Sequence, residues 1–195
     1  MACPTTREAF LLISNFPNDR NRAFEMMLVC GKTGCSQCGF GTAYCRLNGY
    51  GCYRNIPFAR ELLSEGNLKL LSESKPECPV SQYVTASCLE EGFGVDIDKV
   101  QALALYHQSA RAGFAPAQYM LGLFYSIGSE VQQDFEQSIH LFKLAAQQGF
   151  GSSMYYIGLA YERGEGVEVS NKIAKQWYLS ALLAGYDIAS SRLRK

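Results

Sequence analysis

The chain has 195 residues with 18 basic and 18 acidic side chains, so its formal net charge is zero. A balanced charge lacks the basic excess that phosphate binding demands, which argues against a nucleic-acid partner. No apolar stretch approaches the roughly 20 residues that a membrane-spanning helix needs, so we expect a soluble, intracellular, cytoplasmic protein without membrane insertion.

The N-terminal segment carries a sequence that superficially resembles a phosphate-binding loop. Residues 21–30 (NRAFEMMLVC) have the pattern of a helix, and a GKT tripeptide follows at 31–33. A phosphate-binding loop needs a glycine five residues before Gly31, where Met26 stands, and it follows a strand. We therefore expect no nucleotide binding here. The short apolar run at 9–13 has no cleavage site after it, so it is not a secretory signal.

Four cysteines cluster between residues 30 and 45, with C-x4-C-x2-C-x6-C spacing. Four thiolates suit tetrahedral zinc, but a second C-x2-C pair is missing. If residues 38–45 form a helix, its rise of about 1.5 Å per residue separates Cys38 and Cys45 by about 10 Å, too far for one ion. Zinc remains an alternative for these thiols. Its ligands would be Cys30, Cys35, Cys38 and Cys45.

From residue 79 onwards the sequence repeats with a period of 36 residues. The segments AQYMLGLFYSIGSEV (117–131) and SMYYIGLAYERGEGV (153–167) share tyrosines, glycines and a final valine at equivalent positions. An earlier copy, SQYVTASCLEEGFGV, occupies 81–95. Periods of this length are typical of repeat architectures in which neighbouring units share one core.

Each repeated unit has the pattern of two helices. The first helix, over 80–91 in the earliest clear copy, ends at a glycine, and Pro116 suits the first turn of the next. Asp98 and Asp134 are suitable N-caps for the second helices. Neither helix can bury its apolar stripe alone, so the pairs must stack into a solenoid. The second helices are expected to end at Gly113, Gly149 and Gly185.

This pattern resembles the Sel1-like repeat, a relative of the tetratricopeptide repeat. The copy that begins near residue 150 carries the pattern best, although Ser170 stands where aspartate is usual. In the preceding copy Glu130 replaces the second glycine of the turn. Across the three copies, the position where the pattern usually has a basic residue is occupied by Gln101, Gln137 and Ile173. The matching residues are Gly158, Tyr161, Gly164, Gly166, Val167, Ala174, Trp177, Tyr178, Ala181 and Gly185.

The same register extends to the N-terminal part of the chain. A shift of 43 residues places Ala43 and Cys45 on Ala86 and Cys88, and a further unit reaches back to Ala23. We therefore predict an all-α fold, an α/α solenoid of about five Sel1-like helix-turn-helix repeats with a short C-terminal capping helix. The predicted parts of this continuous domain are a degenerate first repeat 1–34, a cysteine-rich second repeat 35–78 with an insertion, repeats 79–113, 114–149 and 150–185, and a cap 186–195.

The register also bears on the cysteines, because it aligns them with small or apolar residues. Cys38 falls on the position of Ala117, and Cys45 on that of Phe124, which favours reduced thiols buried in the core. The resemblance adds an alternative, since cysteine-rich Sel1-like proteins of bacteria pair cysteines at the spacing of Cys30 and Cys38. Such a disulfide would require an oxidising compartment. Core thiols, zinc and a disulfide all remain open.

The resemblance implies a non-catalytic protein-interaction scaffold, an adaptor or assembly factor that holds a partner peptide or domain in a concave groove. No catalytic set emerges from the sequence, so we expect neither an enzyme nor a cofactor. An alternative is a zinc- or redox-responsive regulator that uses the N-terminal cysteines. First-helix positions outside the repeat pattern should contact the partner. The candidates are Gln82, Gln118, Met154, Glu90, Ser126 and Glu162.

Overall fold

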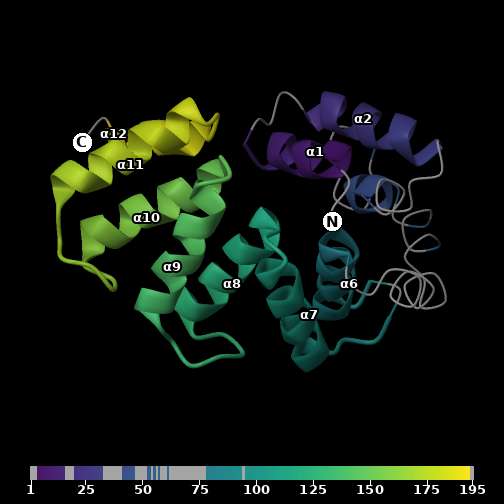
Figure 1. Cartoon of the computed structure of the whole chain (residues 1–195), viewed down its shortest axis with the longest axis horizontal. Helices are drawn as coiled ribbons and strands as arrows, with labels where there is room; N and C mark the ends of the chain where they lie inside the picture. The colour runs from purple at the N-terminus through teal and green to yellow at the C-terminus, as the bar shows by residue number, and fades with distance from the viewer. Residues whose placement is uncertain are drawn as a thin grey trace. The chain divides into compact units, whose positions relative to one another are not determined.

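In the computed structural model, every regular element among the described residues is a helix (Figure 1). The structure describes residues 4–15, 20–32, 41–46, 78–93 and 95–193, together with positions 52, 53, 55, 57 and 61. None of the helices it describes is long and apolar enough to cross a membrane. Cys35 and Cys38 lie outside the described residues, and so does the insertion predicted over 60–78 apart from positions 61 and 78.

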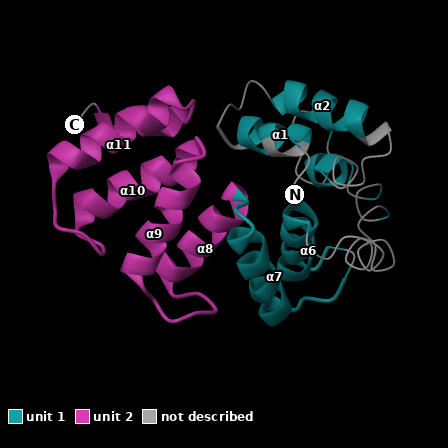
Figure 2. Cartoon of the chain, in the orientation of Figure 1, with its two compact units in different colours: residues 1–13, 17–114 teal, residues 14–16, 115–195 magenta. Residues whose placement is uncertain are grey.

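The chain forms two compact units (Figure 2). Unit 1 comprises residues 1–13 and 17–114, and unit 2 comprises residues 14–16 and 115–195. Unit 1 contains α1 (Pro4–Asn15) as far as Ile13, α2 (Arg20–Lys32), a helical stretch at 41–46, α6 (Pro79–Glu91) and α7 (Lys99–Arg111). Unit 2 contains α8 (Ala115–Ile127), α9 (Phe135–Ala146), α10 (Gly151–Arg163), α11 (Asn171–Leu183), η2 (Asp187–Ala189) and α12 (Ser190–Leu193).

In unit 1, α6 and α7 pack side by side as a helix-turn-helix pair. Pro79 opens α6 in the first turn, where its missing N–H costs nothing, and Gly92 ends the helix in the left-handed region at φ 71°. The side chain of Asp98 then caps α7 by accepting a 2.9 Å hydrogen bond from the backbone N–H of Gln101. The predicted first helix, start of the turn and N-cap are thus confirmed, with α6 beginning one residue earlier than expected.

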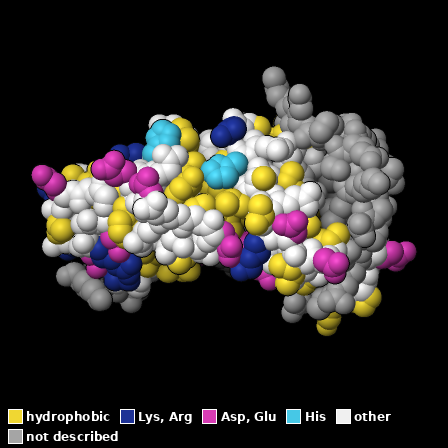
Figure 3. Space-filling view, turned by 90° about the horizontal axis from the view of Figure 1, so that it is seen from below, with side chains coloured by type: hydrophobic (Ala, Val, Ile, Leu, Met, Phe, Trp, Pro, Cys, Tyr) yellow, Lys and Arg dark blue, Asp and Glu magenta, His cyan; other side chains and the backbone are white. Residues whose placement is uncertain are grey.

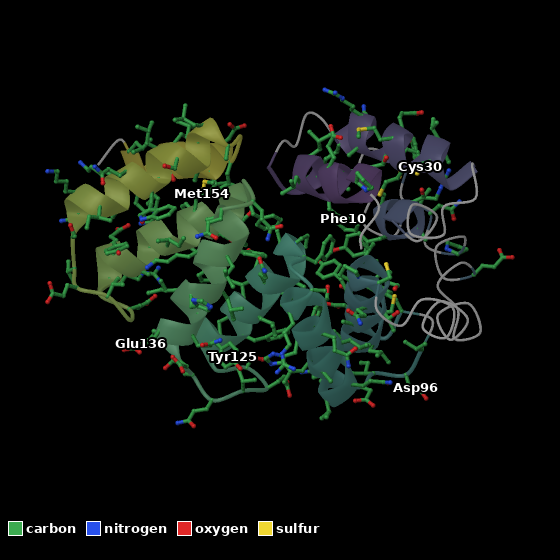
Figure 4. All side chains as sticks on the ribbon, viewed as in Figure 1. Phe10, Cys30, Asp96, Tyr125, Glu136 and Met154 are labelled. Atoms are coloured by element: carbon green, nitrogen blue, oxygen red, sulfur yellow. The ribbon has the colours of Figure 1, made fainter. Side chains whose placement is uncertain are left out.

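An aromatic cluster holds α1 against α6 in unit 1. Phe10 of α1 (labelled in Figure 4) lies edge-on to Tyr83 of α6, with ring centroids 5.8 Å apart. It also meets Phe114 in an edge-on contact at 5.4 Å, and Tyr44 of the 41–46 helix at 5.7 Å. Buried aromatic pairs in these geometries contribute roughly 0.5–1.5 kcal/mol each beyond their area. The N-terminal helices therefore share a core with the first clear repeat.

Unit 2 continues the same pattern, with α8 beside α9, α9 beside α10 and α10 beside α11 (Figure 1). Asp134 caps α9 as predicted, by accepting a 2.9 Å bond from the N–H of Gln137. Ser170, although it replaces the usual aspartate, performs the same role for α11, with its hydroxyl 3.4 Å from the N–H of Ile173. The short elements η2 and α12 pack against α11 and form the predicted C-terminal cap.

The glycines inside the first helices allow close packing of the second helices. A β-carbon added to Gly122 would lie 2.5 Å from a ring carbon of Phe142, and one added to Gly158 would lie at the same distance from Tyr178. The ring of the second helix therefore rests directly on the backbone of the first helix. This packing buries Phe142 and Tyr178 in the core of unit 2.

Candidate functional site

Two of the predicted partner-binding residues, Gln82 and Gln118, are largely buried, with 9% and 5% of their surfaces exposed. The side-chain amide of Gln82 donates a 3.2 Å hydrogen bond to Oε1 of Gln108 on α7. Gln118 accepts a 2.8 Å bond from Nε2 of Gln148, just beyond the end of α9. Both glutamines therefore tie a first helix to its own second helix, and their predicted role in a groove remains a prediction.

Met154, which has the same repeat position as Gln82 and Gln118, lies on α10 (Figure 4) and is half-buried. It packs against the core residue Ile157 and its neighbours, and against the cluster that contains Tyr178. Methionine is flexible and suits irregular gaps of this kind. Its position is therefore explained by packing within unit 2.

Glu90, Ser126 and Glu162 share another repeat position, and the two glutamates accept hydrogen bonds from tyrosines of the second helices. The hydroxyl of Tyr106 donates to Oε2 of Glu90 at 2.8 Å, and Tyr178 donates to Glu162 in the same way, 72 residues further on. Burial, together with the neighbouring carboxylate, raises the pKa of both tyrosines, so each remains a neutral donor. The glutamates thus link the two helices of their own pair.

The pair formed by α8 and α9 lacks this link. Phe142 occupies the tyrosine position and has no hydroxyl to donate, and Ser126 occupies the glutamate position. The Ser126 hydroxyl turns back to donate a 2.9 Å bond to the carbonyl of Leu123 in its own helix. Two polar groups that connect the helices of the other pairs are therefore absent here together.

A cavity of about 180 Å³ lies at this position, between α8, α9 and α10. We call it the apolar cavity. Its walls include Phe142 and Tyr156, whose rings stack with centroids 5.4 Å apart. Its two serine hydroxyls, on Ser126 and Ser138, both donate to backbone carbonyls of α8. The remaining lining residues are Leu123, Ile127, Phe135, Ile139, Leu159, Ala160, Arg163 and Glu165.

A second cavity, of about 200 Å³, lies between α10, α11 and the cap. We call it the polar cavity. Arg192 of the cap donates to Oε1 of Glu162 at 3.3 Å, and its Nε lies 3.4 Å from the hydroxyl of Tyr155. Lys175 contributes a further positive charge. The complete lining is Glu162, Asn171, Ala174, Lys175, Tyr178 and Arg192.

The two cavities occupy equivalent positions in successive helix pairs. Each of the six residues that line the polar cavity lies 36 positions after a residue that lines the apolar cavity. Even Arg192 of the cap corresponds to Tyr156 of α10, because the cap stands where a further first helix would begin. The repeat thus builds the same cavity twice in unit 2 and gives it different side chains.

The charges around these cavities are mixed in sign. Arg163 pairs with Glu165 at 3.5 Å beside the apolar cavity, and both side chains are partly exposed. Among the described residues on the face shown in Figure 3, acidic and basic side chains are interspersed and do not gather into a patch of one sign. This distribution fits a partner that is recognised by local contacts more than by a long-range field.

Three of the described cysteines lie in the core. Cys45, Cys78 and Cys88 are buried, and burial raises the pKa of Cys88 to about 12 and that of Cys45 further. Cys30, near the end of α2 (Figure 4), and Cys52 are half-buried. In the part of the chain that the structure describes, no group of three or more histidine, cysteine or acidic residues could hold a metal. The zinc and Cys30–Cys38 disulfide alternatives involve undescribed residues and stay predictions.

The sequence interpretation missed most of the cavity residues, although it included Ser126 and Glu162. A comparison of aligned columns could have found them. Ile127 aligns with Glu91 and Arg163, and Phe135 aligns with Lys99 and Asn171. Apolar residues at columns that are polar in both neighbours are a signal of a specialised surface, and the repeat register alone reveals them.

Comparisons with known proteins were made on sequence and on structure. A Sel1 repeat model matches residues 36–66, 79–114, 115–150 and 151–186. A Sel1 repeat protein from Oxalobacter formigenes is 30% identical, with a TM-score of 0.61 over 69% of this chain and 98% of that chain. A protective antigen of uropathogenic Escherichia coli with an SLR fold is 26% identical, with a TM-score of 0.65 over 87% of this chain and 35% of that chain.

A more distant likeness supports the fold alone. Cysteine-rich protein B of Helicobacter pylori is 17% identical, with a TM-score of 0.53 over 64% of this chain and 93% of that chain. No curated protein matches the sequence. The helix pairs, their caps and these likenesses agree on an all-α fold of Sel1-like helix-turn-helix repeats.

Proposed function

Because the chain belongs to the Sel1 repeat family, we propose that it is a non-catalytic adaptor that binds a segment of a partner protein. Helix-pair repeats of this class generally mediate protein–protein interaction, since stacking buries their apolar stripes and leaves an extended surface along the row of repeats. The class of function follows from the family. The binding surface has to be argued from the residues themselves.

The observation that carries the proposal is the repeated cavity of unit 2. A cavity between helices that recurs one repeat further on, with the same framework and other side chains, offers a partner successive contact points at regular intervals. Protein interfaces are dominated by a few side chains that enter well-packed pockets. Repeats with different pockets can therefore recognise a short segment by binding successive side chains in successive pockets.

The predicted groove residues contribute to this proposal unequally. Gln82, Gln118 and Glu90 form contacts inside their own helix pairs, which support the framework. Ser126 and Glu162 also line the two cavities, so they combine a framework role with access to a ligand. We therefore place the partner over the cavities of unit 2.

The test is capture of a partner followed by reconstitution. The tagged chain is used as bait in lysate of its native cell at moderate salt, and each co-purifying protein is identified by mass spectrometry. The leading candidate is then purified and titrated against the purified chain by calorimetry. We expect a 1:1 complex with a Kd in the range of about 10⁻⁷ to 10⁻⁵ M, typical of segment recognition.

A heat-denatured bait serves as the control for non-specific capture. If folded bait yields no stoichiometric partner, or if the purified candidate does not bind in the calorimeter, the adaptor proposal is wrong. Catalytic turnover of a captured protein by the purified chain would also contradict it.

A further inference from the structure

Resting on the proposed function, we infer that unit 2 recognises a partner segment with two unlike side chains. An apolar side chain of the segment enters the apolar cavity, and an acidic side chain binds at the polar cavity. The two cavities occupy equivalent positions in the repeat, so the differences between their side chains can be interpreted. Whatever the repeat fold requires should be common to both, and what differs is available for specificity.

The apolar cavity differs from its counterpart by a coordinated set of replacements. Where the polar cavity has the hydrogen-bonded pair Glu162 and Tyr178, the apolar cavity has Ser126 and Phe142. Two further wall residues change in the same direction: Asn171 and Lys175 of the polar cavity correspond to Phe135 and Ile139.

The size of the apolar cavity suits one side chain. An engineered apolar cavity of about 150 Å³ in another protein binds benzene, and the cavity here measures about 180 Å³. Its two serine hydroxyls already donate to backbone carbonyls. A leucine, methionine or phenylalanine side chain fits this volume and chemistry better than a charged one does, because an isolated charge would lose its hydration there.

The rim of the apolar cavity supports the same occupant. Ile127 lines it and leaves 69% of its surface exposed. Its equivalents in the neighbouring pairs are Glu91 and Arg163, which are charged and suit an exposed position. An exposed isoleucine beside an apolar cavity extends the surface that a partner's apolar side chain can cover.

The polar cavity selects the second side chain by charge. The carboxylate of Glu162 already accepts bonds from Tyr178 and Arg192. Lys175 lies on the wall beside them and is exposed, so the cavity lining carries two positive charges against one negative charge. A carboxylate from the partner would complement this excess, and an ammonium would oppose it. We therefore commit to an aspartate or glutamate at this position.

The experiment uses a phage-displayed library of random dodecapeptides, selected on the full chain. Enriched peptides are synthesised and titrated by fluorescence anisotropy. We expect selected peptides to share a leucine, methionine or phenylalanine and an acidic residue at a constant separation. Alanine at the apolar position should weaken binding about tenfold or more, in line with the burial of one large apolar side chain.

Two variants of the protein test the assignment of each side chain to its cavity. Ser126→Glu combined with Phe142→Tyr recreates the hydrogen-bonded pair found in the neighbouring helix pairs and places a carboxylate on the wall of the apolar cavity, so it should weaken binding of the apolar side chain about tenfold or more. Lys175→Glu should weaken binding about fivefold, and lysine at the acidic position of the peptide should restore it. The matched controls are Gln147→Glu and Lys99→Glu, which make the same changes of charge at exposed residues that line neither cavity and should leave binding unchanged.

The outcomes separate this inference from the proposed function. If no peptide is enriched, or if enriched peptides bind the Ser126→Glu, Phe142→Tyr double variant as tightly as the original chain, the inference is wrong. The adaptor proposal survives either result if the captured native partner still forms its 1:1 complex. Should the double variant fail to fold, as judged by its helical circular dichroism, Ser126→Leu takes its place in the comparison, because its larger side chain narrows the apolar cavity.

Discussion

The hydroxyl of Tyr106 donates a 2.8 Å hydrogen bond to the carboxylate of Glu90, and it also lies 3.0 Å from the hydroxyl of Ser87. The ring of Tyr106 is almost completely buried, whereas Glu90 is half-buried. The bond therefore joins the last turns of α6 to the middle of α7 at the edge of the core. Hydrogen bonds to a charged acceptor contribute about 1.5–3 kcal/mol, roughly twice a neutral one.

The first prediction concerns this bond. Tyr106→Phe and Glu90→Ala should each lower the free energy of unfolding by about 1–2 kcal/mol, because each leaves one polar group without its strongest partner. The double variant should lose less than the sum of the single losses, by at least about 0.5 kcal/mol. Chemical denaturation followed by circular dichroism measures all three values. Strictly additive losses would show that the two side chains do not interact.

The second prediction concerns the turns between the paired helices of unit 2. Gly166 adopts φ 71°, and an added β-carbon would lie 2.8 Å from the carbonyl carbon of Phe135, so Gly166→Ala should destabilise the chain by more than about 1 kcal/mol. The equivalent residue Glu130 adopts φ 60° with a full side chain. Glu130→Gly should therefore be neutral or stabilising, by up to about 1 kcal/mol. Thermal melting of both variants is the measurement, and equal effects of one sign would contradict the reasoning.

The third prediction distinguishes two neighbouring glutamines at the end of α9. Gln148 bonds to the buried Gln118 and is half-buried itself, whereas Gln147 is exposed. Gln148→Ala should lower the free energy of unfolding by about 1–2 kcal/mol, because the buried Gln118 loses a donor. Gln147→Ala is the matched control and should change it by less than about 0.5 kcal/mol. Denaturant titration compares the two, and a similar loss for both would argue against the link between α8 and α9.

Much of the fold could be predicted from the sequence because the same helix-capping and turn signals recur in each repeat. Asp98 and Asp134 were recognisable as caps by their position before an apolar run, and Gly113, Gly149 and Gly185 adopt the positive φ that a helix end favours. A residue that departs from the usual repeat pattern can keep the same structural role at its position. Ser170 caps α11 in place of aspartate.

The candidate site was less accessible to sequence reasoning, and the reason is physical. Nothing in the sequence around Gln82 or Gln118 indicates a hydrogen-bond partner. In the structure, Gln82 bonds to a glutamine 26 positions further on, and Gln118 to one 30 positions further on. Those partners, Gln108 and Gln148, do not share a register position, so the repeat gives no sign of them. Burial of a polar side chain depends on a partner that only the packed structure identifies.

The last prediction concerns the buried thiols at alkaline pH. Burial raises the pKa of Cys88 from 9.0 to about 12 and raises that of Cys45, and it acts on the hydroxyls of Tyr106 and Tyr178 in the same direction. Above pH 9 the unfolded chain therefore releases protons that the folded chain keeps. Their stabilising contribution is complete below pH 9 and is lost as the pH rises towards the folded-state values.

The free energy of unfolding should accordingly fall between pH 8 and pH 10, by on the order of 1 kcal/mol from Cys88 alone, since its pKa differs strongly between the two states. Denaturant titrations at both pH values measure this loss, and Cys88→Ala should reduce it by comparison with the original chain. The same burial should protect the thiol from reaction, because the thiolate is the reactive form. Iodoacetamide at pH 8 should modify Cys88 and Cys45 in denaturant and not in the native chain. Rapid native modification of Cys88, or a pH dependence unchanged by its replacement, would show that this thiol is not buried in the core.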